Sequence, residues 1–259
     1  MTWLSGVLAV LSGSIVGFSL GLIGGGGSIL SVPLLIYVVG IRDPHLAIGT
    51  SALAVGVNAF ANFISHWRTG TVKWPCAFVF GGTGVVGAAL GSSLGKAVDG
   101  QKLLFFFALI MIAVGAMMLR PKASGGDPDV QLNPRIAARL VAVAFGTGAI
   151  SGFFGIGGGF LIVPGLMLGS GMPILNAVGS SLFSVGAFGL TTTVNYALSG
   201  LVDWGTAAVF IVGGVFGGFA GLRAALQLAE HRRALSRVFA GVIFVVAAYM
   251  LARVGLAWV

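Results

Sequence analysis

Short polar or glycine-rich breaks divide the chain into ten apolar segments, and this pattern limits its fold more than any other feature. A membrane-spanning helix needs about 20 apolar residues, and two of the segments, 28–40 and 159–170, are too short to span comfortably. Charged residues make up 8% of the 259 residues, against about 25% in a soluble domain. The sequence therefore predicts an all-α polytopic membrane protein, and excludes a soluble enzyme, a disordered chain and a nucleic-acid-binding protein. The segments lie at 3–23, 28–40, 46–65, 74–95, 103–119, 140–155, 159–170, 175–198, 204–226 and 238–258.

The two halves of the chain repeat one another. The stretch 21–35 matches 152–166, with Pro33 on Pro164, and AIGTS at 47–51 matches AVGSS at 177–181. Between the halves lies the only long polar stretch, which is rich in charges and proline and is typical of a loop. The predicted units are a first membrane repeat at 1–119, a linker loop at 120–139 and a second membrane repeat at 140–259.

Basic residues indicate how the chain is oriented, because Lys and Arg collect in cytoplasmic loops. If all ten segments cross, the odd-numbered loops carry ten Lys and Arg and the even-numbered loops carry three. This bias places 120–139 and 227–237 in the cytoplasm and both termini outside, in a multi-pass protein of the bacterial-type inner membrane. The first segment follows no basic residue and is expected to remain as a span, not to be cleaved as a signal peptide.

The number of segments in each half determines the relation between the repeats. Five segments per half would insert the second repeat upside down, giving inverted repeats around broken or re-entrant short helices, a recurrent plan of secondary transporters. Counting each short segment and its predecessor as a re-entrant hairpin leaves three spans per half. This number is also odd, so the repeats stay inverted. If each short segment instead merges with its neighbour to give four spans, the repeats are parallel. This alternative stays open.

Glycine clusters precede both short segments, at Gly24–Gly27 and Gly155–Gly159. Free backbone N–H groups at mid-membrane depth are costly unless they line a cavity. The start of a helix presents several of them together with the positive end of the helix dipole. The alternative is close helix packing through small residues. The duplication favours an anion-binding role for Gly26, Gly27, Ser28, Gly157, Gly158 and Gly159.

Polar residues form a stripe along the third segment, where Thr50, Asn58, Asn62 and His66 fall on one helical face. When the halves are aligned with Met117 on Met250, Thr191, Asn195 and Ser199 lie opposite Asn58, Asn62 and His66. Such stripes either join helices by hydrogen bonds or line a pathway, and His66 is expected to be interfacial and not essential. The candidate side-chain donors to a solute are Thr50, Ser51, Asn58, Asn62, Ser180, Ser181 and Asn195.

Acidic residues are absent from the middle of every segment, since all six lie in loops or at segment ends. Cation carriers and proton pumps usually need an intramembrane carboxylate, so the solute is expected to be anionic or neutral. Cys76 is the single cysteine, which excludes an intramolecular disulfide and a cysteine-based metal site. We expect no cofactor, no metal and no nucleic acid, only a small anionic solute and the lipid bilayer. The sequence leaves a homo-oligomer open.

Each half carries two motifs in the same order, G-x-x-G-x-G-G-G followed by P-x-L, and then A-x-G-T-S. In this order they resemble the TauE/SafE sulfite exporter family of multi-pass transporters. The first half departs from the family pattern at Gly25 and Ser28, and the second at Ser180. The resemblance implies a non-enzymatic, secondary-type transporter of a small anion such as sulfite, a sulfonate or another organosulfur anion. The matching residues are Gly152, Gly155, Gly157, Gly158, Gly159, Pro164, Leu166 and 177–181, and Gly21, Gly24, Gly26, Gly27, Pro33, Leu35 and 47–51.

Two further motifs suggest other functions. Residues 82–87 fit G-x-G-x-x-G, but no soluble α/β unit follows, so a nucleotide site is not expected. Residues 91–95 fit the G-x-S-x-G motif of serine hydrolases, in which Ser93 would pair with His66. No acid completes a triad, and small residues at every fourth position favour helix packing. The alternatives to a transporter are an intramembrane serine hydrolase and a non-transporting membrane assembly subunit.

Overall fold

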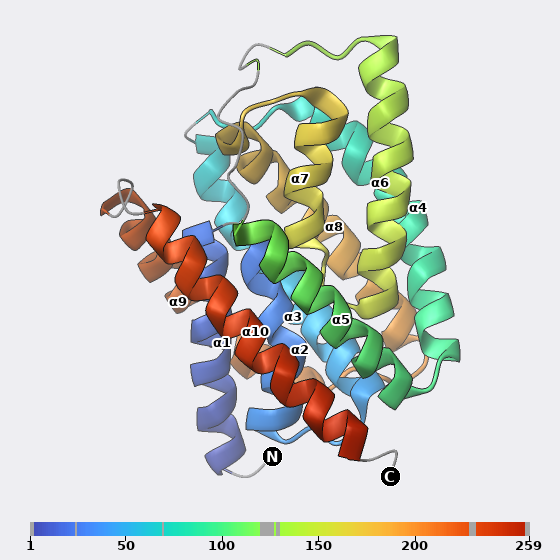
Figure 1. Cartoon of the computed structure of the whole chain (residues 1–259), viewed down its shortest axis with the longest axis vertical. Coiled ribbons are helices and arrows are strands. Elements are labelled where there is room, and N and C mark those ends of the chain that lie inside the picture. The colour runs from blue at the N-terminus through green and yellow to red at the C-terminus, as the bar shows by residue number, and fades with distance from the viewer. Residues whose placement is uncertain are drawn as a thin grey trace.

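The computed structural model describes residues 3–23, 25–68, 70–119, 127, 130–227 and 232–256, and within these ranges the regular structure is entirely helical (Figure 1). Eight helices are long and apolar enough to cross a membrane, and two apolar helices are shorter, at Gly27–Val39 and Gly159–Ser170. The prediction of an all-α polytopic membrane protein is confirmed. The elements are α1 (Trp3–Ile23), the 3-10 helix η1 (Gly25–Leu30), α2 (Ser31–Leu34), the π-helix η2 (Leu35–Val39), α3 (Pro44–Arg68), α4 (Trp74–Ala97), α5 (Gly100–Leu119), α6 (Pro134–Phe154), α7 (Gly159–Ser170), α8 (Ile174–Ala197), α9 (Trp204–Gln227) and α10 (Arg232–Leu256).

The outer faces of these helices are apolar. Large hydrophobic side chains point outward from α1, α4, α9 and α10, and Phe216 and Val245 are 72% and 69% exposed. A soluble monomer rarely exposes so much contiguous apolar surface. The bundle therefore has the outer surface that a lipid environment requires.

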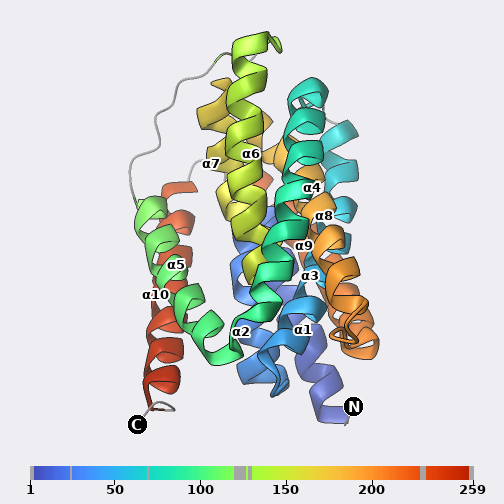
Figure 2. The same cartoon turned by 90° about the vertical axis from the view of Figure 1, so that its right-hand side faces the viewer.

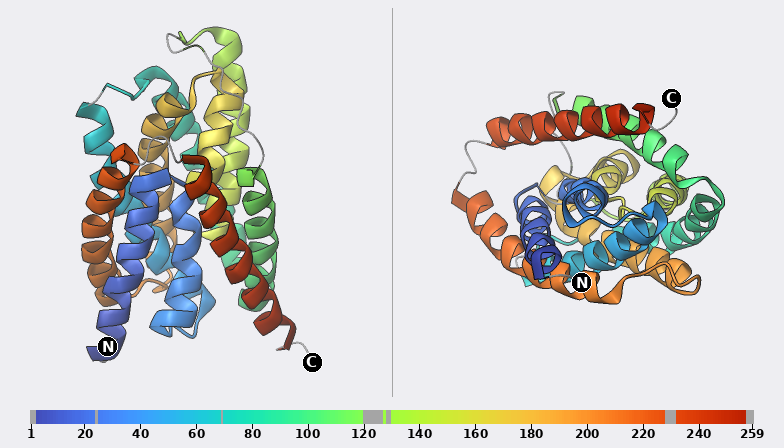
Figure 3. Two further views of the ribbon diagram at one scale, coloured as in Figure 1. Left: turned by 60° about the vertical axis from the view of Figure 1, so that its left-hand side comes forward. Right: turned by 90° about the horizontal axis from the view of Figure 1, so that it is seen from below.

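The helices pack in pairs that join the two halves. α3 and α8 lie along each other, α1 packs on α9, and α6 packs on α4. α5 and α10 form a peripheral pair along one side of the bundle (Figures 2 and 3). In Figure 1, α1 rises from the end that carries both termini, whereas α6, its counterpart in the second half, descends from the opposite end. Inverted repeats require such an arrangement, and inversion stays a prediction.

Glycines allow the closest helix contacts. A Cβ atom added at Gly217 of α9 would meet the carbonyl oxygen of Ser14 in α1, and one at Gly91 of α4 would meet that of Ala149 in α6. Gly87 and Gly95 likewise pack on the backbone of α6. Glycines of the G-x-G-x-x-G and G-x-S-x-G motifs, at 82–87 and 91–95, therefore serve helix packing.

Two helices begin inside stretches that were predicted to be loops. α6 begins at Pro134, inside the expected 120–139 loop, because Asn133 Oδ1 accepts a hydrogen bond from Ile136 N (2.8 Å) and caps the helix. Proline is also favourable at the first helical position. α10 begins at Arg232, inside the expected 227–237 loop. Residues 120–126, 128, 129 and 228–231 lie outside the described ranges.

Candidate functional site

The two glycine breaks have different backbone conformations. In the second, Gly155, Gly157 and Gly158 have φ angles of +64°, +62° and +64°, which residues with a Cβ rarely adopt. α7 then begins at Gly159. In the first, η1 begins at Gly25, and no residue of the described stretch 25–39 has a positive φ. The repeated glycine sequence therefore gives two dissimilar structures.

Gly27 is packed against α1. A Cβ at this position would lie 2.5 Å from Leu20 N and 2.6 Å from Ser19 Cβ. Gly26, Gly27 and Ser28 lie within η1, which continues directly into α2 and η2. Gly27 therefore allows η1 to pack closely on α1. Close packing was the alternative to an anion-binding role for these glycines.

The first bonds of α7 run from Leu161 N and Ile162 N to Gly158 O, and the backbone N–H groups before them have no partner within the helix. Gly158 is its N-cap and offers no side chain to cap the helix, and the first N–H groups of any helix have no partner within it. Ser151 of α6 adjoins this point, because a Cβ at Gly158 would lie 2.5 Å from Ser151 Oγ. Ser151 is fully buried, and its hydroxyl has no hydrogen-bond partner. Backbone and side-chain donors thus meet at one end of the α7 dipole.

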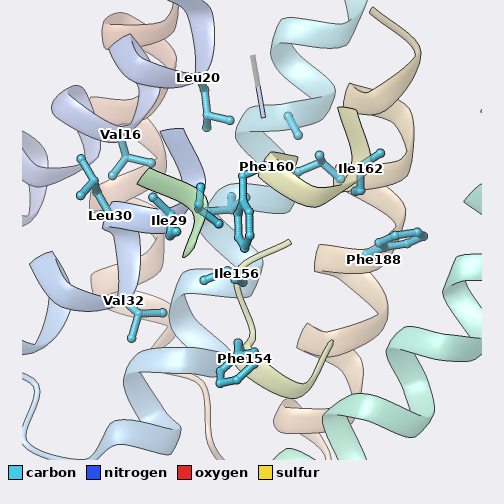
Figure 4. Packing of buried hydrophobic residues seen from close by; sticks show 14 of the residues in the cluster. Val16, Leu20, Ile29, Leu30, Val32, Phe154, Ile156, Phe160, Ile162 and Phe188 are labelled. Atoms are coloured by element: carbon cyan, nitrogen blue, oxygen red, sulfur yellow. The ribbon is translucent and has the colours of Figure 1, made fainter. Parts of the chain in front are cut away.

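The tips of the two broken segments meet between α3 and α8. η1 contacts α7, and a Cβ at Gly157 would lie 2.9 Å from Val55 Cγ1 in α3 and 3.2 Å from Val185 Cγ1 in α8. The buried side chains of Ile29, Ile156 and Phe160 gather at this meeting point (Figure 4). Buried apolar side chains therefore surround the start of α7.

Thr50 and Ser180 anchor loops. Asp203 N donates to Thr50 Oγ1 (3.0 Å), and Lys73 N donates to Ser180 Oγ (2.9 Å). Each contact ties α3 or α8 to the residue that precedes a helix of the other half. Burial would raise the pKa of Asp203, but hydrogen bonds from the Thr206 side chain and from the backbone of Thr206 and Gly205 hold it below its usual value.

Ser51 and Ser181 occupy equivalent positions with different partners. Ser51 and Ser31 share a hydrogen bond between their hydroxyls, and Ser31 Oγ also donates to Ser28 O (2.7 Å). Ser181 Oγ donates to Val178 O (2.8 Å) within its own helix. The first break is therefore tied to α3 by a chain of serines that the second half lacks.

The structure brings Asn58 and Asn62 together but places Asn195 elsewhere. Asn58 and Asn62 contact Gly214 and Gly218 of α9, and Asn62 Nδ2 donates to Asn58 O (2.9 Å). Asn58 is fully buried, and neither Nδ2 nor Oδ1 has a partner. Asn195 Nδ2 instead donates to Ser92 Oγ (2.6 Å) and Ser93 Oγ (2.8 Å) of α4.

The register assumed for the polar stripes is wrong. Asn58 packs on Gly214, and the equivalent contact in the other half is Phe188 on Gly84. Both helices of this contact follow the alignment that places AIGTS at 47–51 on AVGSS at 177–181. The counterpart of Asn58 is therefore Phe188 and not Thr191. The stripe of α3 therefore lacks a polar counterpart at this one position, where a bulky ring occupies the equivalent place. In the same alignment Thr192 and Tyr196 lie opposite Asn62 and His66.

Comparisons with known proteins identify the family. A model of the sulfite exporter TauE/SafE family matches residues 9–250. The chain belongs to the TauE/SafE family. It is 52% identical over 254 residues to a "Probable membrane transporter protein" of Xylella fastidiosa (strain 9a5c), covering 98% of this chain and 97% of that protein.

More distant relatives have similar descriptions. "Probable membrane transporter protein YunE" of Bacillus subtilis (strain 168) is 29% identical, over 83% of this chain and 86% of the relative. The protein MJ0441 of Methanocaldococcus jannaschii, with the same description, is 30% identical, over 77% and 72%. No solved structure matches the chain. This TauE/SafE protein is thus a multi-pass membrane transporter of the bacterial inner-membrane type.

The hydrolase alternative lacks its catalytic pair. His66 Nδ1 lies 3.2 Å from Thr71 Oγ1, close to where α4 begins at Trp74. Ser93 is near the other end of that helix, about 28 Å away at 1.5 Å per residue. The TauE/SafE fold therefore separates the serine from the histidine.

Several buried polar residues were missed by the sequence analysis. The match of 21–35 to 152–166 places Leu20 opposite Ser151, so the repeat gave no signal there. His45 Nδ1 and Tyr196 OH are buried without partners, and their rings lie 6.3 Å apart. Lys96 Nζ lies 5.9 Å from the centre of the Tyr196 ring. The alignment of AIGTS on AVGSS pairs Tyr196 with His66. With this alignment, the sequence would have indicated Tyr196 as a polar counterpart of His66.

Proposed function

We propose that this TauE/SafE transporter carries a small anion, such as sulfite, a sulfonate or another organosulfur anion, which binds at the start of α7. The observation that supports this most is the uncapped start of α7 beside the buried, unpartnered hydroxyl of Ser151. Gly157, Gly158 and Gly159 supply the backbone N–H groups, and Ser151 supplies a side-chain donor.

The chemistry of this point suits an oxyanion. A helix N-terminus carries roughly half a positive charge, and its N–H groups all donate. Hydrogen bonds to a charged acceptor are about twice as strong as neutral ones, and the apolar shell of Ile29, Ile156 and Phe160 lowers the local dielectric. The same groups would disfavour a cation, which needs acceptors. The three oxygens of a sulfite or sulfonate group can accept from several donors at once.

We infer that transport uses inverted repeats. The pairs α1–α9 and α6–α4, and the opposite directions of α1 and α6 in Figure 1, support inversion. For a solute to reach the α7 site, the tips of η1 and α7 have to part. Thr50 and Ser180 then serve as anchors for the loops before α9 and α4, while Asn58 and Asn62 lie where α3 faces α9.

Flux into proteoliposomes tests the proposal directly. Purified protein is reconstituted, and uptake of sulfite and methanesulfonate is compared for wild type, Ser151→Ala, Gly158→Ala and Gly146→Ala. Loss of a hydrogen bond to a charged group should lower apparent affinity about tenfold in Ser151→Ala. Gly158→Ala should lose transport, because its φ is +64° and its Cβ would meet Ser151.

Gly146→Ala is the matched control, since it lies on the same helix as Ser151 and nothing lies within 4 Å of an added Cβ. It should transport like wild type. Monodispersity in detergent shows which variants fold. Wild-type flux by folded Ser151→Ala and Gly158→Ala would place the site elsewhere. If the wild-type protein carries none of the anions, a non-transporting assembly role gains support instead.

A further inference from the structure

A second feature suited to anions lies at the end of the bundle that carries both termini. A cavity of about 260 Å³ opens between η2, the start of α3, the start of α5 and the end of α10. Its polar lining comes from Tyr37, Arg42, Gln101 and Arg253, and Leu104 and Val254 form part of its apolar wall. Figures 1 and 2 show the ends of these elements close to the N- and C-termini. The cavity is therefore well separated from the middle of the bundle.

The cavity carries net positive charge. Its lining includes two guanidinium groups and no acidic residue. The two acidic residues nearest in sequence to the lining residues cap helices. Asp43 Oδ1 accepts from His45 N (2.8 Å), and Asp99 Oδ1 accepts from Gln101 N (3.1 Å) and Lys102 N (3.2 Å). Two positive charges with a phenol and a carboxamide beside them form a set of donors suited to an oxyanion.

Aromatic contacts hold one of the arginines. Arg253 Cζ lies 6.0 Å from the centre of the Tyr249 ring, and Tyr249 in turn packs edge to face with Tyr37 at 5.1 Å. Such cation–π contact uses the face of the guanidinium and leaves its N–H edge available. The geometry thus positions Arg253 without consuming the donors that an anion would use.

Arg42, one of the two arginines of the cavity, is not repeated in the second half. With AIGTS aligned on AVGSS, the counterpart of Arg42 is Met172, which is 1% exposed. Arg42 closely follows η2, after the left-handed turn at Gly40 (φ +91°). An anion held between Arg42 and Arg253 would therefore bridge the first broken segment and the peripheral pair of α5 and α10.

We propose that this cavity is a surface oxyanion site that takes a sulfonate, sulfate or phosphate group. The proposal stands apart from the α7 site, because it uses different residues at a different depth. The oxyanion is either a free anion from the adjacent solution or the phosphate of an anionic phospholipid headgroup. Both present the same chemistry to the two guanidinium groups.

Binding measurements on the full-length protein in neutral detergent test the site. Sulfate is titrated calorimetrically at low ionic strength, and retention of phosphatidylglycerol is followed by native mass spectrometry. Arg42→Gln and Arg253→Gln should each lower the affinity for the ligand that uses the cavity about tenfold, as expected for loss of a charged hydrogen-bond donor. Arg139→Gln removes the same charge from an exposed position at the other end of the bundle, and should change affinity less than about twofold.

The two ligands distinguish the source of the oxyanion. Arginine-dependent binding of sulfate assigns the site to a free anion, and arginine-dependent retention of phosphatidylglycerol alone assigns it to a lipid headgroup. Equal binding of both ligands by wild type and the two arginine variants would overturn the proposal, as would no binding of either. If Arg253→Gln does not fold, Arg253→Lys provides the test, since it keeps the charge and loses the planar fork.

Ser151→Ala separates this proposal from the proposed function. Sulfate binding that survives Ser151→Ala but is lost in both arginine variants supports the surface site and counts against the α7 site. The reverse pattern, together with phosphatidylglycerol retention that does not depend on either arginine, overturns the surface site and supports the α7 site. Two sulfate sites, one lost in each class of variant, support both.

Discussion

Asn58 is the residue whose chemistry fits least with a purely structural role. It is fully buried, and neither amide atom has a partner, which costs about 1–3 kcal/mol per unsatisfied group. Its counterpart in the other half is Phe188, so the fold accepts an apolar side chain at the equivalent place. A polar group retained at such a cost suggests contact with a solute or with water during transport.

We predict that Asn58→Leu leaves thermal stability equal to or above that of wild type, while transport falls about tenfold, as for one lost hydrogen bond to a charged group. Unfolding of the purified protein and flux into proteoliposomes measure the two effects. Ser12→Ala is the control, because Ser12 Oγ is also buried and unpartnered but lies on α1. Wild-type flux in Asn58→Leu would assign Asn58 to packing alone.

Repetition in the sequence drew attention to some of these residues and not to others. The glycines at 157–159 stood out because they recur, and the structure gives Gly157 and Gly158 positive φ angles. Ser151 carries no such signal, since Leu20 stands at the equivalent position. The partners of Thr50 and Ser180 lie 153 and 107 residues away in the chain, and no local pattern predicts a contact of that range.

At the scale of elements, the hydroxyls of Thr50 and Ser180 fix where α9 and α4 begin. Each accepts from the backbone N–H of the residue just before the helix, Asp203 or Lys73. We predict that Thr50→Val and Ser180→Ala each lower stability by about 1 kcal/mol, the usual net value of a hydrogen bond. The effects should add in the double variant because the contacts share no partner.

Thermal unfolding in detergent measures these losses, and Ser181→Ala serves as control, since its hydroxyl bonds only to Val178 O of its own helix. Transport by both variants should stay near that of wild type at temperatures where they are folded. Abolished flux in a stable Thr50→Val or Ser180→Ala protein would instead show that this hydroxyl binds the solute.

The elements themselves were largely predictable, because an apolar run of span length leaves a chain in lipid with few alternatives to a helix. The errors lie at charged ends. Arg135 and Arg139 resemble a loop in sequence, yet both belong to α6, whose start is set by the cap at Asn133. The change from 3-10 to π geometry between Gly25 and Val39 has no counterpart in the hydropathy pattern.

The whole molecule depends on pairing between halves, which sequence indicates only in part. Glycines at every fourth position of α1 and α9 suggest close contact, but not that these two helices are partners. The structure shows that Gly17 of α1 meets Gly214 of α9, while Gly148 of α6 meets Gly84 of α4. Such contacts depend on how the two helices are aligned in space, which a glycine pattern does not specify. The duplication itself was evident from the ordered motifs.

Basic residues predict which end of the whole bundle faces the cytoplasm. The starts of α1 and α6 lie at opposite ends (Figure 1). If both repeats insert as proposed, ten Lys and Arg fall at or near the end where α6 starts, and four, including Arg253, fall at the other. This bias places the start of α6 in the cytoplasm. In a Cys76→Ala background, a membrane-impermeant maleimide should label Leu4→Cys in intact spheroplasts, and Arg135→Cys only after permeabilisation.

Both positions are exposed and close to the starts of their helices, so accessibility reports the side of the membrane and not burial. Labelling of Arg135→Cys in intact spheroplasts, with protection of Leu4→Cys, would reverse the orientation. The result also determines which side of the membrane the Arg42 and Arg253 cavity faces, because the cavity lies at the end with the termini. With the termini outside, that cavity holds its oxyanion on the external face, where an imported anion would first meet the protein and an exported one would leave it.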